Sequence, residues 1–127
     1  MQIAEGAFIG YPVTDVERSR GFYEGVLGLT VTRTFGGGDR VWIEYDLGPT
    51  TFAISNMAKE NWKPSSDGPC VAFEVTDFDA AVAELKAKKV PFELEPMQTP
   101  ACWMAIIADP DGNKLTVHKR HSETPLQ

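Results

Sequence analysis

The chain has 127 residues, the length of one ordinary domain, which can bury enough surface to fold without disulfides or a structural metal. No apolar run approaches the length needed to cross a bilayer and mean hydropathy is -0.21, so the sequence excludes a membrane-spanning helix. A formal net charge of -6 repels phosphate groups, which argues against nucleic acid and favours a neutral or cationic small molecule as the partner.

Two cysteines, Cys70 and Cys102, lack the spacing of a metal or redox motif and the density of a secreted scaffold. They are typical of reduced thiols in a cytoplasmic protein, and a disulfide between them is the alternative. The first residues have no basic region followed by a long apolar stretch, so we expect no secretory signal.

One short motif occurs twice: Val13-Thr14-Asp15 returns 62 residues later as Val75-Thr76-Asp77. Before each copy lies a stretch of β-branched and aromatic residues, and after it the apolar residues take helical spacing. The pattern predicts a strand followed by a helix in each half, with helices over residues 15–27 and 77–88. Glu17 lies three residues after Thr14, and Asp79 lies three residues after Thr76. These spacings predict that the two threonines cap the helices.

Three strand-like segments follow each predicted helix, and glycine or proline marks the turns between them. The segments are residues 29–35, 40–47 and 51–55 in the first half, and 91–96, 102–108 and 114–119 in the second. The sequence therefore predicts an α+β fold of two tandem βαβββ modules within a single domain, residues 1–127. The modules are residues 3–55 and 70–119, with a linker at 56–69 and a polar tail at 120–127.

The chain resembles the vicinal oxygen chelate superfamily of glyoxalases, bleomycin-resistance proteins and extradiol dioxygenases. The resemblance rests on Val13-Thr14-Asp15, Phe22-Tyr23, Val26-Leu27-Gly28-Leu29 and the closing Asp109-Pro110-Asp111-Gly112-Asn113, and it covers almost the whole chain. It implies a curved, partly closed mixed sheet with helices on the outside and a ligand cup between the modules. In drug-sequestering members, it further implies a homodimer.

The resemblance also implies that metal-dependent members draw one His or Glu from each of four strands. The matching positions here are Phe8, Ala53, Cys70 and Thr116. Phe and Ala cannot bind a metal, so we expect no metal ligands and no cofactor at these positions. This weighs against glyoxalase-type isomerisation and extradiol ring cleavage, since both need the ion to hold the substrate oxygens.

Strand alternation predicts which side chains face the cup, because residues two apart share a face of a sheet. The predicted ligand-binding residues are Phe8, Trp42, Ala53, Cys70, Trp103 and Thr116. Tyr11 and Trp62 add to the aromatic residues that could stack on a flat ligand, and core or dimer packing is the alternative for each. Cys70 could be a reactive thiol, but no base is predicted beside it, so the sequence favours an inert buried thiol.

Glu44, Glu74 and His118 are the candidate catalytic residues, since carboxylates and an imidazole in the cup could transfer protons. The alternatives are solvated carboxylates, counter-charges for a cationic ligand, and an exposed histidine at a strand end. A displaced divalent metal site would require all three side chains to gather within about 5 Å of one another.

Three functions follow from these patterns. The first is a metal-independent small-molecule-binding protein that sequesters its ligand. The second is a lyase or isomerase that uses Glu44, Glu74 or His118 for proton transfer. The third is a non-catalytic interaction module.

Overall fold

The computed structural model describes residues 1–121 and divides the chain into two units, Met1–Pro64 and a second that begins at Ser65. Residues 122–127 of the predicted polar tail lie outside the described residues. Each unit contains one strand, one helical segment and three further strands, in the predicted order. In the part of the chain that is described, no helix is long and apolar enough to cross a membrane.

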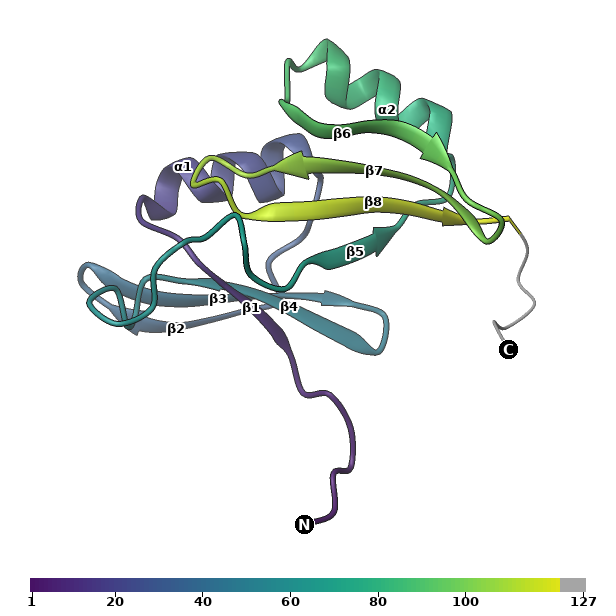
Figure 1. Cartoon of the computed structure of the whole chain (residues 1–127). Helices are drawn as coiled ribbons and strands as arrows, with labels where there is room; N and C mark the ends of the chain where they lie inside the picture. Colours follow the sequence, from purple (N-terminus) through teal and green to yellow (C-terminus); the bar gives the residue numbers. More distant parts are fainter. Residues whose placement is uncertain (122–127) are drawn as a thin grey trace. The chain divides into compact units, whose positions relative to one another are not determined.

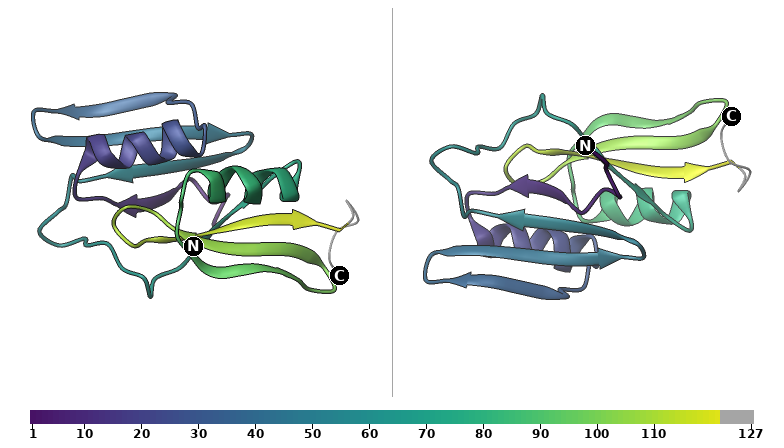
Figure 2. Two further views of the ribbon diagram at one scale, coloured as in Figure 1. Left: turned by 90° about the horizontal axis from the view of Figure 1, so that it is seen from above. Right: turned by 90° about the horizontal axis from the view of Figure 1, so that it is seen from below.

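The first unit places its four strands in the order β1-β4-β3-β2, with β1 parallel to β4 and the other neighbours antiparallel. Its elements are β1 (Ile9–Pro12), α1 (Val16–Arg20), η1 (Gly21–Val26), β2 (Arg33–Gly37), β3 (Arg40–Leu47) and β4 (Thr50–Ser55). Figure 2 shows the helical segment lying over this sheet, along the direction of its strands. The single predicted helix is thus an α-helical turn that continues as a π-helix.

The second unit repeats this arrangement with the strand order β5-β8-β7-β6. Its elements are β5 (Val71–Glu74), α2 (Phe78–Ala87), β6 (Phe92–Gln98), β7 (Cys102–Ala108) and β8 (Lys114–Arg120). Helix α2 lies along one face of the sheet (Figure 1). The expected mixed sheet is therefore found as two four-stranded sheets, one in each repeat. The predicted bounds of β3 and β7 agree with the structure.

The helix caps differ from the prediction by one position. Asp15 and Asp77, not Thr14 and Thr76, are the capping residues. Each aspartate accepts a hydrogen bond from the backbone amide three residues later, at 3.1 Å and 3.0 Å. Aspartate is as good a cap as serine and better than threonine, and its charge suits the positive end of the helix. The Thr14 hydroxyl instead accepts from the guanidinium of Arg18 at 3.3 Å.

Aromatic rings form the core of the first unit, between the helical segment and the sheet. Tyr23, Tyr45 and Phe52 are completely buried. The ring centroids of Tyr23 and Phe52 lie 5.2 Å apart, and those of Tyr23 and Tyr45 lie 6.4 Å apart. Tyr11 packs on the same side, 5.3 Å from Phe52, so it is a core residue and not part of a ligand-stacking group.

Aliphatic side chains form the core of the second unit. Buried residues of β7 and β8 alternate along each strand, and they share the face that α2 covers with Leu85 of that helix. These residues are Ala105, Ile107, Leu115 and Val117. The opposite face of each sheet carries no helix of its own unit, and we call it the helix-free face.

The closing turn of the second unit lies where the proline and glycine of its sequence predict a turn, and the Asp109 side chain holds it. The Asp109 carboxylate accepts from the amides of Asp111 and Asn113, both at 2.9 Å. Gly112 takes a positive φ of 86°, which glycine adopts without strain. The Asn113 side chain then accepts from the Ser65 amide at 3.2 Å, so this turn also anchors the start of the unit.

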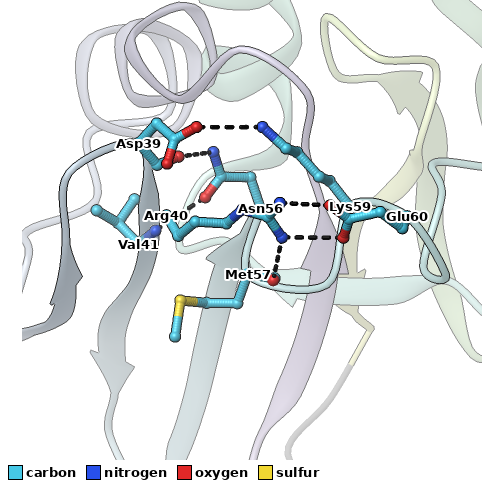
Figure 3. Close-up of polar contacts among 7 residues, drawn as sticks. All are labelled: Asp39, Arg40, Val41, Asn56, Met57, Lys59 and Glu60. Atoms are coloured by element: carbon cyan, nitrogen blue, oxygen red, sulfur yellow. Dashed lines mark hydrogen bonds and ion pairs between the residues drawn. The ribbon is translucent and has the colours of Figure 1, made fainter.

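The chain after β4 is tied to the β2–β3 hairpin by the polar cluster of Figure 3. Asn56 bridges two hairpin backbone groups, donating to the Asp39 carbonyl at 2.6 Å and accepting from the Val41 amide at 2.8 Å. The Arg40 guanidinium binds the Glu60 carboxylate through two nitrogens. Its hydrogen bonds lower the pKa of Glu60 to about 2. The first part of the predicted linker is therefore an ordered loop.

Candidate functional site

Phe8, Trp42, Glu44 and Ala53 share the helix-free face of the first sheet, as their spacing predicts. Trp42 and Glu44 alternate with the buried Ile43 and Tyr45 along β3, and Glu44 lies opposite Ala53 of β4. The Trp42 indole donates to the Glu44 carboxylate at 2.9 Å. The Phe8 and Trp42 rings meet edge to face, with centroids 5.0 Å apart.

Trp62 joins this group because Gly10 leaves room for it. Gly10 pairs with Ala53 and carries no side chain. A Cβ atom there would lie 3.2 Å from the Trp62 ring and 3.4 Å from Phe8. The loop that carries Trp62 is held by the Arg40 and Glu60 contacts described above. The linker tryptophan therefore docks on the sheet, as its position in an otherwise polar segment suggested.

Sequence reasoning missed two further side chains on this face, Arg33 and Phe35. In the β2–β3 pairing Arg33 lies opposite Glu44 and Phe35 lies opposite Trp42. The Arg33 guanidinium lies 5.7 Å from the centre of the Phe35 ring, within the range of a cation–π contact. Counting back from a two-residue turn at Gly38 and Asp39 would have found both.

The corresponding face of the second sheet carries a polar pair beside apolar side chains of β7, since Met104 and Ile106 lie opposite His118 and Thr116. Glu74 and His118 lie opposite each other on β5 and β8, and the His118 Nδ1 atom is 2.5 Å from the Glu74 carboxylate. The second carboxylate oxygen accepts from the Arg120 amide at 2.8 Å. Burial alone would raise the pKa of Glu74, but the hydrogen bonds from Arg120 and His118 outweigh it, so this pKa is lowered.

Cys70 and Thr116 also approach each other in the second unit. The Cys70 sulfur lies 3.2 Å from the Thr116 hydroxyl and 3.4 Å from the Lys114 carbonyl, to which it donates. Cys70 is exposed, whereas the sequence favoured a buried thiol. Both cysteines are free thiols, and Cys102 is buried beside the Thr99 hydroxyl.

Trp103 is the one predicted ligand-binding residue that the structure places on the other face of its sheet. It lies opposite Lys119 in the β7–β8 pairing, two residues from the buried Val117, so it shares the face covered by α2. Its ring stacks on Phe78, the first residue of that helix, with centroids 6.4 Å apart. Trp103 is therefore separated from Thr116 and His118 by the thickness of the sheet.

The four family ligand positions do not fit a metal ion. Phe8 and Ala53 have no donor atom, and the Cys70 and Thr116 groups are engaged with each other. Across residues 1–121, no three side chains of His, Cys, Asp or Glu are gathered so that they could hold a metal. The three residues of the displaced metal site considered from the sequence are divided between the units: Glu44 belongs to the first, and Glu74 and His118 belong to the second.

The strand order, the parallel first and last strands of each repeat and the paired helices define the class of α+β proteins built from two βαβββ units. Residues 7–117 match the profile of the Glyoxalase/Bleomycin resistance protein/Dioxygenase superfamily. The chain belongs to this superfamily. A search of curated proteins finds no match.

Three solved structures are similar to this chain in fold. TnmS3, an antibiotic binding protein from Streptomyces sp. CB03234, is 22% identical with a TM-score of 0.76, covering 94% of this chain and 98% of its own. A glyoxalase/bleomycin resistance protein from the same organism is 23% identical with a TM-score of 0.73, covering 89% and 98%. A superfamily member from Sphaerobacter thermophilus DSM 20745 is 22% identical with a TM-score of 0.74, covering 93% and 98%. At these identities the similarity establishes the fold alone.

Proposed function

We propose that this chain binds a small, flat organic molecule on the helix-free face of the first sheet, without a metal ion. The observation that carries the proposal is the edge-to-face contact of Phe8 and Trp42 beside Trp62, on a face where Phe8 is 52% exposed. A stacked aromatic ring contributes about 0.5–1.5 kcal/mol beyond the area it buries. Three adjacent rings can therefore supply much of the binding energy of a flat ligand.

Charged groups beside the rings favour a neutral or cationic ligand. Glu44 is held next to Trp42 by the indole hydrogen bond, and a cation above this pair would meet both the carboxylate and the ring face. Arg33 lies at the edge of the group over Phe35, where it can donate hydrogen bonds to a polar substituent of the ligand. TnmS3, which is similar in fold, is an antibiotic binding protein, and this supports a ligand-binding role here.

The test is a thermal-shift screen with cationic aromatic compounds and dicarbonyl adducts, followed by calorimetric titration of the hits. Trp42→Ala should weaken binding about tenfold, equivalent to about 1.4 kcal/mol. Thr34→Ala is the matched control, because Thr34 belongs to the same hairpin but lies opposite Ile43 on the other face. An equal loss in both variants, or no stabilising compound in the screen, would contradict the proposal.

The contact between Glu74 and His118 supports a second candidate, a lyase or isomerase that works by proton transfer. A carboxylate bound to one imidazole nitrogen orients the ring and leaves the other nitrogen to act as a base. His118 would remove a proton from the carbon beside a substrate carbonyl and return it to a neighbouring atom. The lowered pKa of Glu74 keeps it charged for this role.

Exchange of that carbon-bound proton for deuterium in a 2-oxoaldehyde hemithioacetal, followed by NMR, tests the second candidate. His118→Gln should abolish the exchange, and Glu74→Gln should slow it about 100-fold, within the range of general acid–base catalysis. Elemental analysis of protein purified without chelator tests the absence of a metal. A stoichiometric transition metal in each chain would contradict a metal-free protein.

The superfamily resemblance extends the proposal to a homodimer in the cytoplasm. Light scattering after size-exclusion chromatography tests the first point, since a dimer should have twice the 14.0 kDa mass of the chain. Fractionation of the source cells tests the second.

A further inference from the structure

A cavity of about 320 Å³ lies in the second unit beside the first turn of α2. Its walls come from the turn before the helix, from the start of β7 and from the end of β8. The lining residues are Thr76, Asp77, Phe78, Asp79, Trp103 and Lys119. It belongs to the helix-covered face, whereas Glu74 and His118 lie on the opposite face of the same sheet. It is therefore separate from both sites proposed above.

Trp103 provides an aromatic wall that is exposed and yet fixed in position. Its side chain is 41% exposed, although one ring face stacks on the buried Phe78 at an interplanar angle of 27°. The ring of His121 meets it edge to face at 5.2 Å, and His121 is itself held 2.8 Å from the Thr99 carbonyl. These two contacts restrain the indole, so less side-chain ordering remains to be made on binding.

The charged residues that line the cavity favour one class of ligand. Asp77 and Asp79 contribute two carboxylates and Lys119 contributes one ammonium group, so the lining has a net charge of one negative unit. A helix N-terminus by itself attracts anions. Here the Asp77 carboxylate already accepts a hydrogen bond from the Ala80 amide, and the carboxylates of Asp77 and Asp79 repel an anionic ligand. A purely apolar ligand would leave the carboxylates unpaired. An organic cation satisfies both the carboxylates and the indole, since tryptophan is the ring that cations prefer.

We propose that this cavity binds a small organic ammonium ion, with the cationic head against Trp103 and the carboxylates of Asp77 and Asp79. Phe78 stacks on the Trp103 indole and so supports the ring against which the apolar part of such a ligand would lie. Lys119 opposes the bound charge, so it limits the affinity of the site. The proposal is independent of the flat-ligand site on the first sheet.

Benzyltrimethylammonium chloride is the probe, titrated into the whole protein labelled with ¹⁵N. The indole N–H resonances of Trp42, Trp62 and Trp103 are assigned from single Trp→Phe variants. We expect the Trp103 signal to move in a saturable way, and any movement of the Trp42 signal reports separately on the flat-ligand site of the first sheet. Benzyl alcohol, a neutral compound with the same ring, should move the Trp103 signal far less.

Two variants test whether negative charge in the lining strengthens binding and positive charge weakens it. Asp79→Asn should weaken binding about fivefold and Lys119→Gln should tighten it about threefold, the range for partly exposed charges near a ligand. Asp67→Asn makes the same change in net charge elsewhere in the unit and should leave affinity unchanged. Both Asp79 and Lys119 keep some exposure, so these variants should fold.

Three results would overturn the proposal: equal shifts with benzyl alcohol, tighter binding in Asp79→Asn, or a Trp103 signal that does not respond. Because Trp42 and Trp103 are observed separately, the outcome at one site does not decide the outcome at the other. A response at Trp42 alone would support the flat-ligand site and exclude this one.

Discussion

The two repeats have the same strand order and present different chemistry on equivalent faces. On the first sheet the helix-free face carries aromatic rings, with Trp42 bound to Glu44. On the second sheet the equivalent face carries a carboxylate bound to an imidazole, Glu74 with His118. The comparison shows that the βαβββ scaffold sets where side chains point, while the residue types decide which groups each face presents.

The helix-covered faces of the two sheets also differ in the side chains that form the core of each unit. Aromatic residues fill the core of the first unit around Phe52, and aliphatic residues fill the core of the second around Leu115. Both side chains are completely buried. Matched substitutions in the two cores therefore test whether the repeats unfold together or separately.

The largest expected effect comes from emptying each core in turn. Phe52→Ala should destabilise the protein by about 3–5 kcal/mol and Leu115→Ala by about 2–5 kcal/mol, through lost burial and the cavity left behind. If the chain is one cooperative domain, as its length predicts, each variant should shift a single unfolding transition measured by calorimetry. Two transitions, with only one of them moved by each substitution, would show that the repeats unfold independently.

A smaller effect should separate the hairpin glycines of the two repeats. Gly36 and Gly112 both have positive φ, at 93° and 86°. A Cβ atom on Gly36 would lie 2.4 Å from the Arg40 carbonyl oxygen, whereas Gly112 has open space. Gly112→Ala should therefore cost about 1–2 kcal/mol for the left-handed backbone alone, and Gly36→Ala should cost about 3 kcal/mol or more.

Chemical denaturation of both variants measures this difference as a change in the midpoint at constant slope. Gly37→Ala is the control, because Gly37 has open space around its missing Cβ and is not among the glycines with positive φ. Equal losses in Gly36→Ala and Gly112→Ala would mean that the hairpin backbone relaxes away from the clash.

Much of the fold could be predicted because the two halves repeat the same local signals. Residues 40–47 alternate with the period of a strand and residues 102–108 form a short apolar run, and the observed β3 and β7 cover these ranges. Helix caps were missed by one residue because Thr and Asp are adjacent in both copies and both can accept the hydrogen bond. Local sequence alone does not decide between two neighbouring caps.

The candidate sites were less predictable because they depend on pairing between strands. Glu74 and His118 share a face by alternation, but only the parallel β5–β8 register places them directly opposite each other. Trp103 was placed on the wrong face because its strand offered no neighbour whose burial was certain. Arg33 and Phe35 were missed because their face follows from the register of the β2–β3 hairpin, which pairs them with Glu44 and Trp42.

The smallest expected effect concerns the Glu74 and His118 pair on the helix-free face of the second sheet. The pKa of Glu74 in the folded protein lies below its ordinary value, so the unfolded chain binds the proton more readily. The contribution of Glu74 to stability is therefore present above its ordinary pKa of 4.5 and is lost as pH falls through the lowered value. The Glu74 and His118 side chains are 39% and 24% exposed, so screening limits this contribution to about 0.5 kcal/mol.

Urea denaturation of the wild type and Glu74→Gln should show this difference at pH 6 and a smaller difference at pH 3, because the Glu74 carboxylate takes up its proton as the pH falls through the lowered pKa. His118→Asn removes one of the two hydrogen bonds that hold the Glu74 carboxylate and leaves the Arg120 amide in place. It should therefore show an intermediate loss at pH 6. A gap between wild type and Glu74→Gln that is the same at both pH values would mean that the pair contributes through packing, and a charged carboxylate would no longer account for the orientation of His118.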